Sequence, residues 1–307
     1  MSACGEHIMT TVAYIGLGAM GLPLARHLVR KGFDVIAYDI EPARADEIVE
    51  LGGRKAGSVA EAARDVEVVI TCLPATPHVE AVVLGPDGAL AQMKPGTLLL
   101  DMSTIDANGT DRVAKACAAK GVAFVDSPIG RLVLHAERGE SLFMVGASDE
   151  DFARVEPLLN AMGKDIMRCG GQGMGSRMKL VNNFLLLTIA EVSAEAVALG
   201  TRLGLDIDTI LKVTGSTTAQ NGQLHTLMVN KVLKGDTVPG FTIDLAFKDM
   251  TLAMTAAAEY RMGLPVGAAA HAVYGGARAM PEFATKDYSA LLEWACRNAG
   301  VETPRTT

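Results

Sequence analysis

The sequence has no pair of cysteines spaced as CxxC, the spacing typical of structural zinc sites and dithiol redox sites. Its five cysteines are odd in number and scattered, and none has a histidine nearby at metal-ligand spacing: Cys4, Cys72, Cys117, Cys169 and Cys296. We therefore expect a protein of a reducing compartment that binds no metal.

An excess of basic charge is also missing. The 28 Lys and Arg residues are outnumbered by 35 Asp and Glu residues, which gives a net charge of -7, and the basic residues are dispersed along the chain. Nucleic-acid binding needs a basic surface that releases counterions from phosphates. We expect no nucleic-acid partner.

Apolar runs long enough to cross a membrane are absent as well. The most apolar run, residues 184–190 (FLLLTIA), is far shorter than a bilayer-spanning helix. The first ten residues, MSACGEHIMT, lack the cationic start and apolar core of a secretory signal, so we expect a disordered lead-in. No internal repeat is visible. These absences favour a cytoplasmic protein without a membrane partner.

What the first half of the chain does contain is a regular alternation of short apolar runs and helical patterns. The runs that read as strands are 11–16 (TVAYIG), 33–39 (FDVIAYD), 66–74 (VEVVITCLP), 96–103 (GTLLLDMS), 122–128 (VAFVDSP) and 141–146 (SLFMVG). Such alternation predicts a mostly parallel sheet with crossover helices. We predict an α/β protein whose NAD-binding, Rossmann-type domain covers residues 1–170.

After residue 170 the strand signals stop, and apolar residues recur at helical spacing. We predict an all-helical domain over 171–307, which serves substrate binding and oligomerisation. Its first helix is predicted to run from about 175 to 203, roughly 40 Å at 1.5 Å per residue. The near-continuous apolar surface of this helix needs cover from several sides, so we expect a homodimer or homotetramer.

A glycine-rich turn follows the first predicted strand. Gly16, Gly18 and Gly21 form GxGxxG between a strand pattern and a helical pattern. The first glycine permits the tight turn, the second lets a pyrophosphate approach the backbone, and the third lets helix and strand pack closely. Ala19 and Met20 are then the expected amide donors at the helix N-terminus. The alternative is a glycine-rich turn that holds no ligand.

The second predicted strand ends at Asp39, where this fold places an acid on the adenosine ribose. An acid there repels a 2'-phosphate, and Ile40 and Glu41 follow it instead of an arginine. The sequence therefore favours NAD(H) over NADP(H). Arg44 lies near enough in sequence for a folded loop to return it to this position.

Three segments, together with the glycine motif, resemble the β-hydroxyacid dehydrogenase family, which includes the 3-hydroxyisobutyrate dehydrogenases. They are DMSTI at 101–105, GMGSRMKLVNN at 173–183 and FTIDLAFKDMTLA at 241–253. The resemblance covers nearly the whole chain. It implies a Rossmann domain, a long helix and a helical domain, with NAD(P)-dependent interconversion of a hydroxy acid and its carbonyl form in an interdomain cleft.

The resemblance makes Lys179 the catalytic residue and assigns Asn182 and Asn183 to substrate binding. The chemistry is consistent, because Lys179 and Asn183 are i and i+4 and project from one helical face. As an ammonium, Lys179 would protonate the carbonyl oxygen during reduction, and a pKa lowered by burial would serve both directions. The alternative is an ordinary solvated lysine.

The remaining roles rest on the resemblance too. It assigns Ser103 to the substrate and Thr104 to the cofactor, although a Ser-Thr pair also caps helices without touching a ligand. It places Lys248 on the bound nucleotide, with Asp249 orienting that lysine. The loop residues Leu73 and Pro74 would lie against the cofactor.

The segment 126–131 departs from the family. Most members carry Ser-Gly-Gly after DxPV and bind the substrate carboxylate with its amides, whereas this chain reads DSPIGR with Gly130 and Arg131. GRLVLHAERG resembles the GRTxxxAxxG pattern of the 3-sulfolactaldehyde reductase branch, except that Leu132 replaces the threonine. Arg131 offers a fork of donors to an oxyanion. Its alternative role is an ion pair with Glu137 or Glu140.

These features predict an NADH-dependent reductase of a short anionic semialdehyde, with 3-sulfolactaldehyde as the favoured substrate and 2,3-dihydroxypropane-1-sulfonate as its product. Carboxylate substrates are the main alternative: succinic semialdehyde, tartronate semialdehyde, or 3-hydroxyisobutyrate for the reverse reaction. A catalytically silent NAD-binding sensor is the alternative from another class, and the joint presence of Lys179, Asn183 and Ser103 weighs against it.

Overall fold

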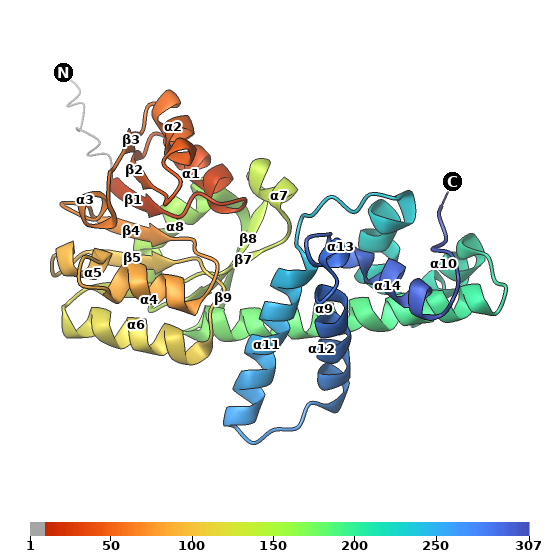
Figure 1. Cartoon of the computed structure of the whole chain (residues 1–307). Coiled ribbons are helices and arrows are strands. Elements are labelled where there is room, and N and C mark those ends of the chain that lie inside the picture. Colours follow the sequence, from red (N-terminus) through yellow and green to blue (C-terminus); the bar gives the residue numbers. More distant parts are fainter. Residues whose placement is uncertain (1–9, 307) are drawn as a thin grey trace. The chain divides into compact units, whose positions relative to one another are not determined.

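The computed structural model describes residues 10–306 and divides the chain into two compact units (Figure 1). The N-terminal unit ends at Lys179, and the C-terminal unit begins at Leu180. The predicted boundary after residue 170 falls at the end of the last strand of the N-terminal unit. Residues 1–9 of the expected lead-in, with Cys4, lie outside the described residues.

The N-terminal unit is built on one nine-stranded sheet in the order β3-β2-β1-β4-β5-β6-β8-β7, with β9 also paired to β8. The strands are β1 (Thr11–Ile15), β2 (Asp34–Tyr38), β3 (Arg54–Lys55), β4 (Val68–Thr71), β5 (Leu98–Asp101), β6 (Ala123–Asp126), β7 (Ile129–Gly130), β8 (Ser141–Gly146) and β9 (Gly163–Gly170). The first six are parallel, while β8 runs antiparallel to β6 and β7. The predicted mostly parallel Rossmann sheet is confirmed.

Helices cover both faces of this sheet (Figure 1). On one face lie α1 (Gly21–Arg30), α2 (Ala43–Glu50) and α8 (Asp149–Met162); on the other lie α3 (Val59–Ala62), α4 (Thr76–Leu84), α5 (Ala89–Gln92) and α6 (Ala107–Ala119). Along β1 the buried side chains of Val12 and Tyr14 pack on the first face, and those of Ala13 and Ile15 on the second. A strand buried on both faces has an unbroken apolar sequence, which is why these strands were readable as continuous runs.

Helices are the regular secondary structure of the described residues of the C-terminal unit, apart from one isolated bridge between Thr242 and Asp287. After α9 (Met174–Arg202) come α10 (Ile207–Gly215), a π-helical turn η1 (Gln223–Met228), η2 (Val232–Lys234), α11 (Ile243–Glu259), α12 (Pro265–Arg278), α13 (Pro281–Ala284), η3 (Tyr288–Ala290) and α14 (Leu291–Asn298). The buried Tyr274 hydroxyl donates to the Leu187 carbonyl at 3.1 Å, which joins α12 to α9. The predicted long helix and all-helical domain are confirmed.

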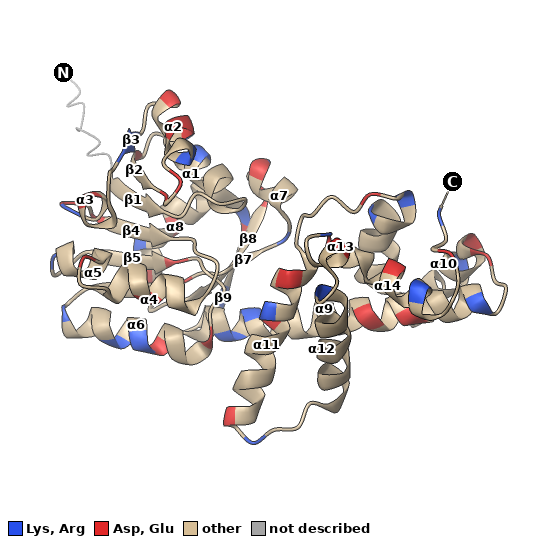
Figure 2. Cartoon of the chain, in the orientation of Figure 1, with Lys and Arg blue, Asp and Glu red and all other residues tan. Residues whose placement is uncertain are grey.

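Charged residues of both signs are interspersed along the helices of each unit (Figure 2). Among the described residues, α9 is the one helix with the length and composition of a membrane span, and 44% of its most apolar window is buried. A core helix has the same composition. The first turn of α9 is hydrogen-bonded to Asp126 of the N-terminal unit. Further along the helix, Leu187, Ala190 and Ala194 are buried in the C-terminal unit, as expected for a core helix.

One buried acid in α9 makes stability depend on pH. Glu191 is only 4% exposed, its Oε2 has no hydrogen-bond partner, and burial together with the nearby Glu195 raises its pKa from 4.5 to about 8. A carboxyl with a raised folded pKa contributes its stability in full below 4.5 and loses it as pH rises through 8. Replacing Glu191→Gln should therefore stabilise the protein at pH 9 by roughly 2–4 kcal/mol and change little at pH 4.5.

Denaturant titrations at the two pH values measure this difference. The matched control is Glu195→Gln on the same helix, whose exposed side chain should give a much smaller change. Equal effects of Glu191→Gln at both pH values would contradict the assignment.

Candidate active site

The glycine turn between β1 and α1 has the close packing that GxGxxG provides. Gly16 has φ of +100°, and a Cβ there would lie 2.3 Å from the Cys72 carbonyl oxygen; a Cβ on Gly21 would lie 2.0 Å from the Gly16 oxygen. Both positions are therefore closed to any side chain. By contrast, a Cβ on Gly18 would meet nothing within 4 Å. The backbone is thus open to approach at the glycine that contacts a pyrophosphate in this fold.

The first turn of α1 is suited to an anion. Met20 is the N-cap of α1 and makes no side-chain capping hydrogen bond, and Ala19 beside it is exposed. Uncapped N–H groups and the positive end of the helix dipole favour a phosphate at this place. The glycines, Ala19 and Met20 together fit the pyrophosphate of a dinucleotide.

Asp39 lies at the end of β2 and is only 8% exposed. Its Oδ2 accepts the Leu17 amide at 2.7 Å, and its Oδ1 accepts the Glu41 amide at 2.9 Å. The Asp39 carboxylate therefore stabilises the glycine turn through the Leu17 amide, and it lies at the end of β2, where the ribose of the cofactor is expected. Arg44 does fold back: its Nη2 lies 2.8 Å from Glu41 Oε2, and its Nη1 lies 3.7 Å from Asp39 Oδ1.

The carboxyl ends of β4 and β5 are joined by a buried polar network. Asp101 Oδ1 accepts the Thr71 hydroxyl at 2.8 Å and the Ser103 amide at 3.1 Å, and burial raises the pKa of Asp101. The Leu73 amide donates to Ser103 Oγ at 2.9 Å, and Ser103 is 3% exposed. Ser103 thus holds the Leu73 loop in place. Pro74 is exposed and Thr104 is half-buried.

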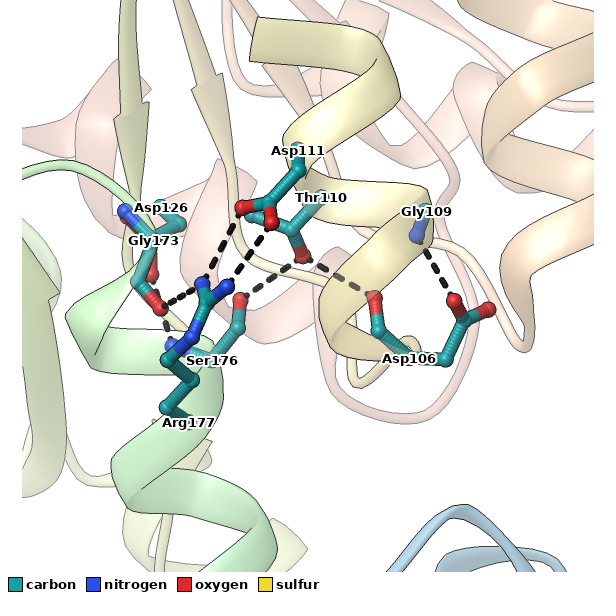
Figure 3. Close-up of polar contacts among 8 residues, drawn as sticks. All are labelled: Asp106, Gly109, Thr110, Asp111, Asp126, Gly173, Ser176 and Arg177. Atoms are coloured by element: carbon teal, nitrogen blue, oxygen red, sulfur yellow. Dashed lines mark hydrogen bonds and ion pairs between the residues drawn. The ribbon is translucent and has the colours of Figure 1, made fainter. Parts of the chain in front are cut away.

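Asp126 anchors the first turn of α9 (Figure 3). Its fully buried carboxylate accepts the Gly173 amide with Oδ1 and the Ser176 amide with Oδ2, each at 2.6 Å. Burial raises the pKa of Asp126 to about 6, against the lowering effect of these amides. A Cβ on Gly175 would lie 2.1 Å from the Met144 carbonyl oxygen, so this turn packs directly on the sheet.

Helix α6 supports the same turn from the outside (Figure 3). The Thr110 hydroxyl donates to Ser176 Oγ at 3.2 Å, and Arg177 binds both carboxylate oxygens of Asp111, at 3.1 and 2.8 Å. The start of α9 is therefore fixed by buried and surface contacts.

Lys179 follows one turn later. Its Nζ donates to the Ile129 carbonyl oxygen at 2.7 Å, and the residue is half-buried. Ile129 and Gly130 form β7, so the Lys179 ammonium lies beside the strand that leads into Arg131. The sequence-predicted lysine and the substrate segment are brought together.

Arg131 has φ of +73°, the left-handed conformation that favours glycine. Its Nη1 donates to the Glu140 carbonyl oxygen at 2.6 Å, and its Nη2 donates to Asp165 Oδ2 at 2.5 Å. An ion pair was the alternative role weighed from the sequence, but the carboxylate partner is Asp165, not Glu137 or Glu140. About a third of the Arg131 side chain remains exposed.

Four polar residues of the C-terminal unit are connected by hydrogen bonds and an ion pair: Asn182, Asn183, Asp249 and Lys248. Asn182 Nδ2 donates to Asn183 Oδ1 at 2.9 Å, and Asn183 Nδ2 donates to Asp249 Oδ2 at 2.5 Å. Lys248 Nζ lies 2.9 Å from Asp249 Oδ1. Asn183 and Asp249 are both 3% exposed. The carboxylate of Asp249 thus fixes the amide of Asn183 and pairs with Lys248, the contact expected of a residue that orients Lys248. The nucleotide contact of Lys248 stays a prediction.

Family comparisons match both units. Residues 11–171 match the NAD binding domain of 6-phosphogluconate dehydrogenase, and residues 173–295 match the NAD-binding domain of NADP-dependent 3-hydroxyisobutyrate dehydrogenase. A 3-sulfolactaldehyde reductase of Escherichia coli (strain K12) is 38% identical over 293 residues, which cover 95% of this chain and 98% of that protein. The chain belongs to the β-hydroxyacid dehydrogenase family.

Other members of the β-hydroxyacid dehydrogenase family agree with this assignment. A 3-hydroxyisobutyrate dehydrogenase of Pseudomonas aeruginosa is 36% identical over 92% of this chain and 97% of its own length. The solved Mycobacterium tuberculosis 3-hydroxyisobutyrate dehydrogenase with L-serine is 32% identical, with a TM-score of 0.86 over 94% of this chain and 99% of that one. The chain is an oxidoreductase of this family with NAD(P)-binding domains.

Sequence reasoning missed three supporting residues of this β-hydroxyacid dehydrogenase: Asp101, Asp126 and Asp165. Asp126 lies near the end of the predicted strand 122–128 and ends the observed strand β6, and a polar residue at this place is a signal that a side chain lies at the functional edge of the sheet. Its partners, the amides of Gly173 and Ser176, lie 47 and 50 residues away and carry no side-chain signal. Asp165 lies on β9, a strand that the sequence did not reveal.

Proposed function

We propose that this chain is an NADH-dependent reductase of short anionic aldehydes and that 3-sulfolactaldehyde is its substrate. The observation that carries the proposal is the placement of the Lys179 ammonium 2.7 Å from the carbonyl of Ile129, two residues before Arg131. The proposed proton donor, Lys179, is thus hydrogen-bonded to the backbone two residues before the proposed anion-binding residue, Arg131. The 38% identity to a 3-sulfolactaldehyde reductase supports the same substrate class.

The residues present fit the proposed reduction. NADH, when bound, supplies the hydride to the carbonyl carbon. Lys179 holds the proton at Nζ and donates a hydrogen bond to the Ile129 carbonyl oxygen, and in the proposed reaction the same ammonium donates to the aldehyde oxygen of the bound substrate. As the C=O π bond breaks, that oxygen takes the Nζ proton and becomes the product hydroxyl. The neutral amine then regains a proton from water.

Asn183 is prepared as a second donor. Its Oδ1 accepts from Asn182 and one N–H donates to Asp249, so the orientation of its amide is fixed and one N–H remains for the substrate. Asn183 and Lys179 project from one side of α9, one turn apart. A fixed donor stabilises developing charge without reorganisation during the reaction.

Arg131 is the proposed anchor for the sulfonate, because a guanidinium offers paired donors to an oxyanion. A specific observation favours a second candidate, a carboxylate semialdehyde. The guanidinium is held by Asp165 and Glu140, and the positive φ at residue 131 keeps the backbone shape that a glycine would give. In that case the amides of the turn, as in the family's Ser-Gly-Gly segment, would bind the carboxylate.

Two variants separate these candidates. If the guanidinium binds the sulfonate, Arg131→Ala and Arg131→Gly should both lower kcat/KM for 3-sulfolactaldehyde about 30-fold, the loss expected for a charge-assisted hydrogen bond of about 2 kcal/mol. If the turn binds the anion, Arg131→Gly should retain activity on succinic semialdehyde and Arg131→Ala should lose it. Binding of NADH without turnover of any aldehyde would support the sensor alternative.

The NADH preference rests on Asp39, with Glu41 pairing Arg44 beside it. Replacing Glu41→Gln should free Arg44 for a 2'-phosphate and raise kcat/KM for NADPH about three- to fivefold, because an exposed ion pair is worth at most about 1 kcal/mol. The value for NADH should stay within twofold. Adding Arg44→Ala should remove the gain; a gain that survives this second change would contradict the role of Arg44.

We also propose a homo-oligomer in the cytoplasm, where free thiols such as those of Cys72, Cys117, Cys169 and Cys296 stay reduced. Exposed apolar side chains recur along α9 at helical spacing: Met178, Val181, Leu185, Val192 and Leu199, each 41–60% exposed. Such a stripe favours a helix face covered by a second copy. Sedimentation should give at least a dimer, and Leu185→Asp should lower the mass; a monomeric wild type would contradict the proposal.

A further inference from the structure

His27 connects the cofactor helix to the segment that follows β7. It lies on α1, and its Nε2 is 3.0 Å from the Ala136 carbonyl oxygen and 3.1 Å from the Glu137 carbonyl oxygen. Carbonyl oxygens only accept hydrogen bonds, so Nε2 carries a hydrogen and donates to both. These two carbonyls lie at the end of α7 (Val133–Glu137), more than 100 residues away in sequence.

Residues 131–140, which we call the substrate loop, form a closed unit. The Arg131 guanidinium donates to the Glu140 carbonyl, the Leu132 amide donates to His135 Nδ1 at 3.3 Å, and the Glu140 amide donates to the His135 carbonyl at 2.7 Å. Because the loop is braced internally, it should move as a body. Among the contacts that tie this body to other elements are the ion pair of Arg131 with Asp165 on β9, the hydrogen bonds of the far end with His27 on α1, and the buried Ala136 side chain in the core.

The His27 ring is also fitted to the loop by shape. Gly139 has φ of +68°, and a Cβ there would lie 3.3 Å from His27 Cε1. The ring therefore lies directly on the loop backbone. The His27 ring therefore both hydrogen-bonds to the loop and packs against its backbone.

The connection joins the two sites that the proposed function assigns to the cofactor and to the substrate. Helix α1 begins at Gly21 on the glycine turn, and His27 lies six residues later, about 9 Å along the axis. The loop begins directly after Gly130, next to the Ile129 carbonyl that accepts Lys179. A shift of the loop would displace Arg131 and disturb the Ile129 carbonyl that accepts the hydrogen bond from Lys179.

We infer that His27 is a positioning residue: it holds the substrate loop against the cofactor helix and so sets the geometry of the anion end of the substrate. This inference rests on the proposed function, in which the loop contacts the substrate. His27 touches neither the reacting atoms nor the glycine turn. Its loss should therefore affect substrate binding more than chemistry or cofactor binding.

Three variants test the inference: His27→Ala, His27→Gln and, as a control, His78→Ala on an exposed position of α4. His27→Ala should raise KM for the anionic aldehyde about five- to tenfold, the effect of one or two lost hydrogen bonds, while kcat stays within threefold and the Kd of NADH within twofold. Glutamine places an N–H near the position of Nε2, so His27→Gln should restore KM. His78→Ala should change none of these values.

Amide hydrogen exchange supplies a readout that needs no activity. His27→Ala should speed exchange in residues 133–140 and His27→Gln should not. An unchanged KM and unchanged exchange in His27→Ala would overturn the inference, as would a loss of thermal stability without a change in KM. If the wild type reduces no anionic aldehyde, the proposed function fails, and the exchange result still decides whether His27 holds the loop.

Discussion

Replacing Lys179 by alanine should lower kcat for aldehyde reduction about 10³- to 10⁴-fold, because the variant loses the positioned proton donor and its charge near the developing alkoxide. Lys179 is the ammonium beside the Ile129 carbonyl, and Ile129 lies on the strand that leads into the proposed anion site. The measurement is the single-turnover rate of NADH oxidation with saturating aldehyde.

Two controls separate chemistry from folding. The Kd of NADH, measured by fluorescence, should stay within twofold, because in the proposed function the glycine turn and the N-terminus of α1 bind the cofactor, whereas Lys179 acts on the substrate. A small primary amine added to Lys179→Ala should restore part of the rate, whereas a tertiary amine without N–H should not. A variant that keeps more than a tenth of the wild-type rate would show that another group donates the proton.

Replacing Asp126 by alanine should lower the free energy of unfolding by about 2–4 kcal/mol, because the buried amides of Gly173 and Ser176 would lose their acceptor. The Gly173 amide lies directly before α9 and the Ser176 amide lies in its first turn, so the loss should also loosen the helix that carries Lys179. Denaturant titration measures the stability, and hydrogen exchange in residues 173–179 locates the change.

The matched control is Asp111→Ala, which removes a carboxylate from the same junction (Figure 3). The Asp111 side chain is 52% exposed, so its ion pair with Arg177 should contribute less than about 1 kcal/mol. Equal losses in the two variants would contradict the view that the buried carboxylate holds the helix.

The strands of the sheet core were predictable because they are buried on both faces and therefore apolar throughout. β9 was not, because it carries Lys164, Asp165 and Arg168 and is only partly buried, so neither an apolar run nor a clear alternation marks it. β3 and β7 are two residues long, which is too short for an apolar run or an alternation to mark them. The long helix was predicted within one residue at each end, since its apolar pattern is continuous.

The glycine turn was also predictable, because its roles are set by local backbone geometry and by motif spacing. The supporting contacts were not, since they join side chains to distant backbone groups. Asp126 accepts amides at the start of another element. The Arg131 guanidinium donates to the Glu140 carbonyl and to the carboxylate of Asp165, which lies on β9, a strand that the sequence did not predict. A sequence indicates which side chains are present at the sheet edge, whereas tertiary packing decides what each one contacts.

The positive φ of Arg131 shows how a substitution can preserve a backbone shape. An arginine in the left-handed region is strained by about 1 kcal/mol relative to glycine, and such strain persists where the surroundings hold the residue. The bonds to Glu140 and Asp165 provide that hold. The loop therefore holds a left-handed turn at residue 131 although that residue is an arginine.

We propose that this β-hydroxyacid dehydrogenase reduces a sulfonated aldehyde with NADH. The most direct test of this proposal is the ratio of kcat/KM for 3-sulfolactaldehyde to that for succinic semialdehyde, measured with purified wild type and NADH. We expect a ratio well above ten, falling toward one in Arg131→Ala. A wild-type ratio near one that Arg131→Ala leaves unchanged would contradict it.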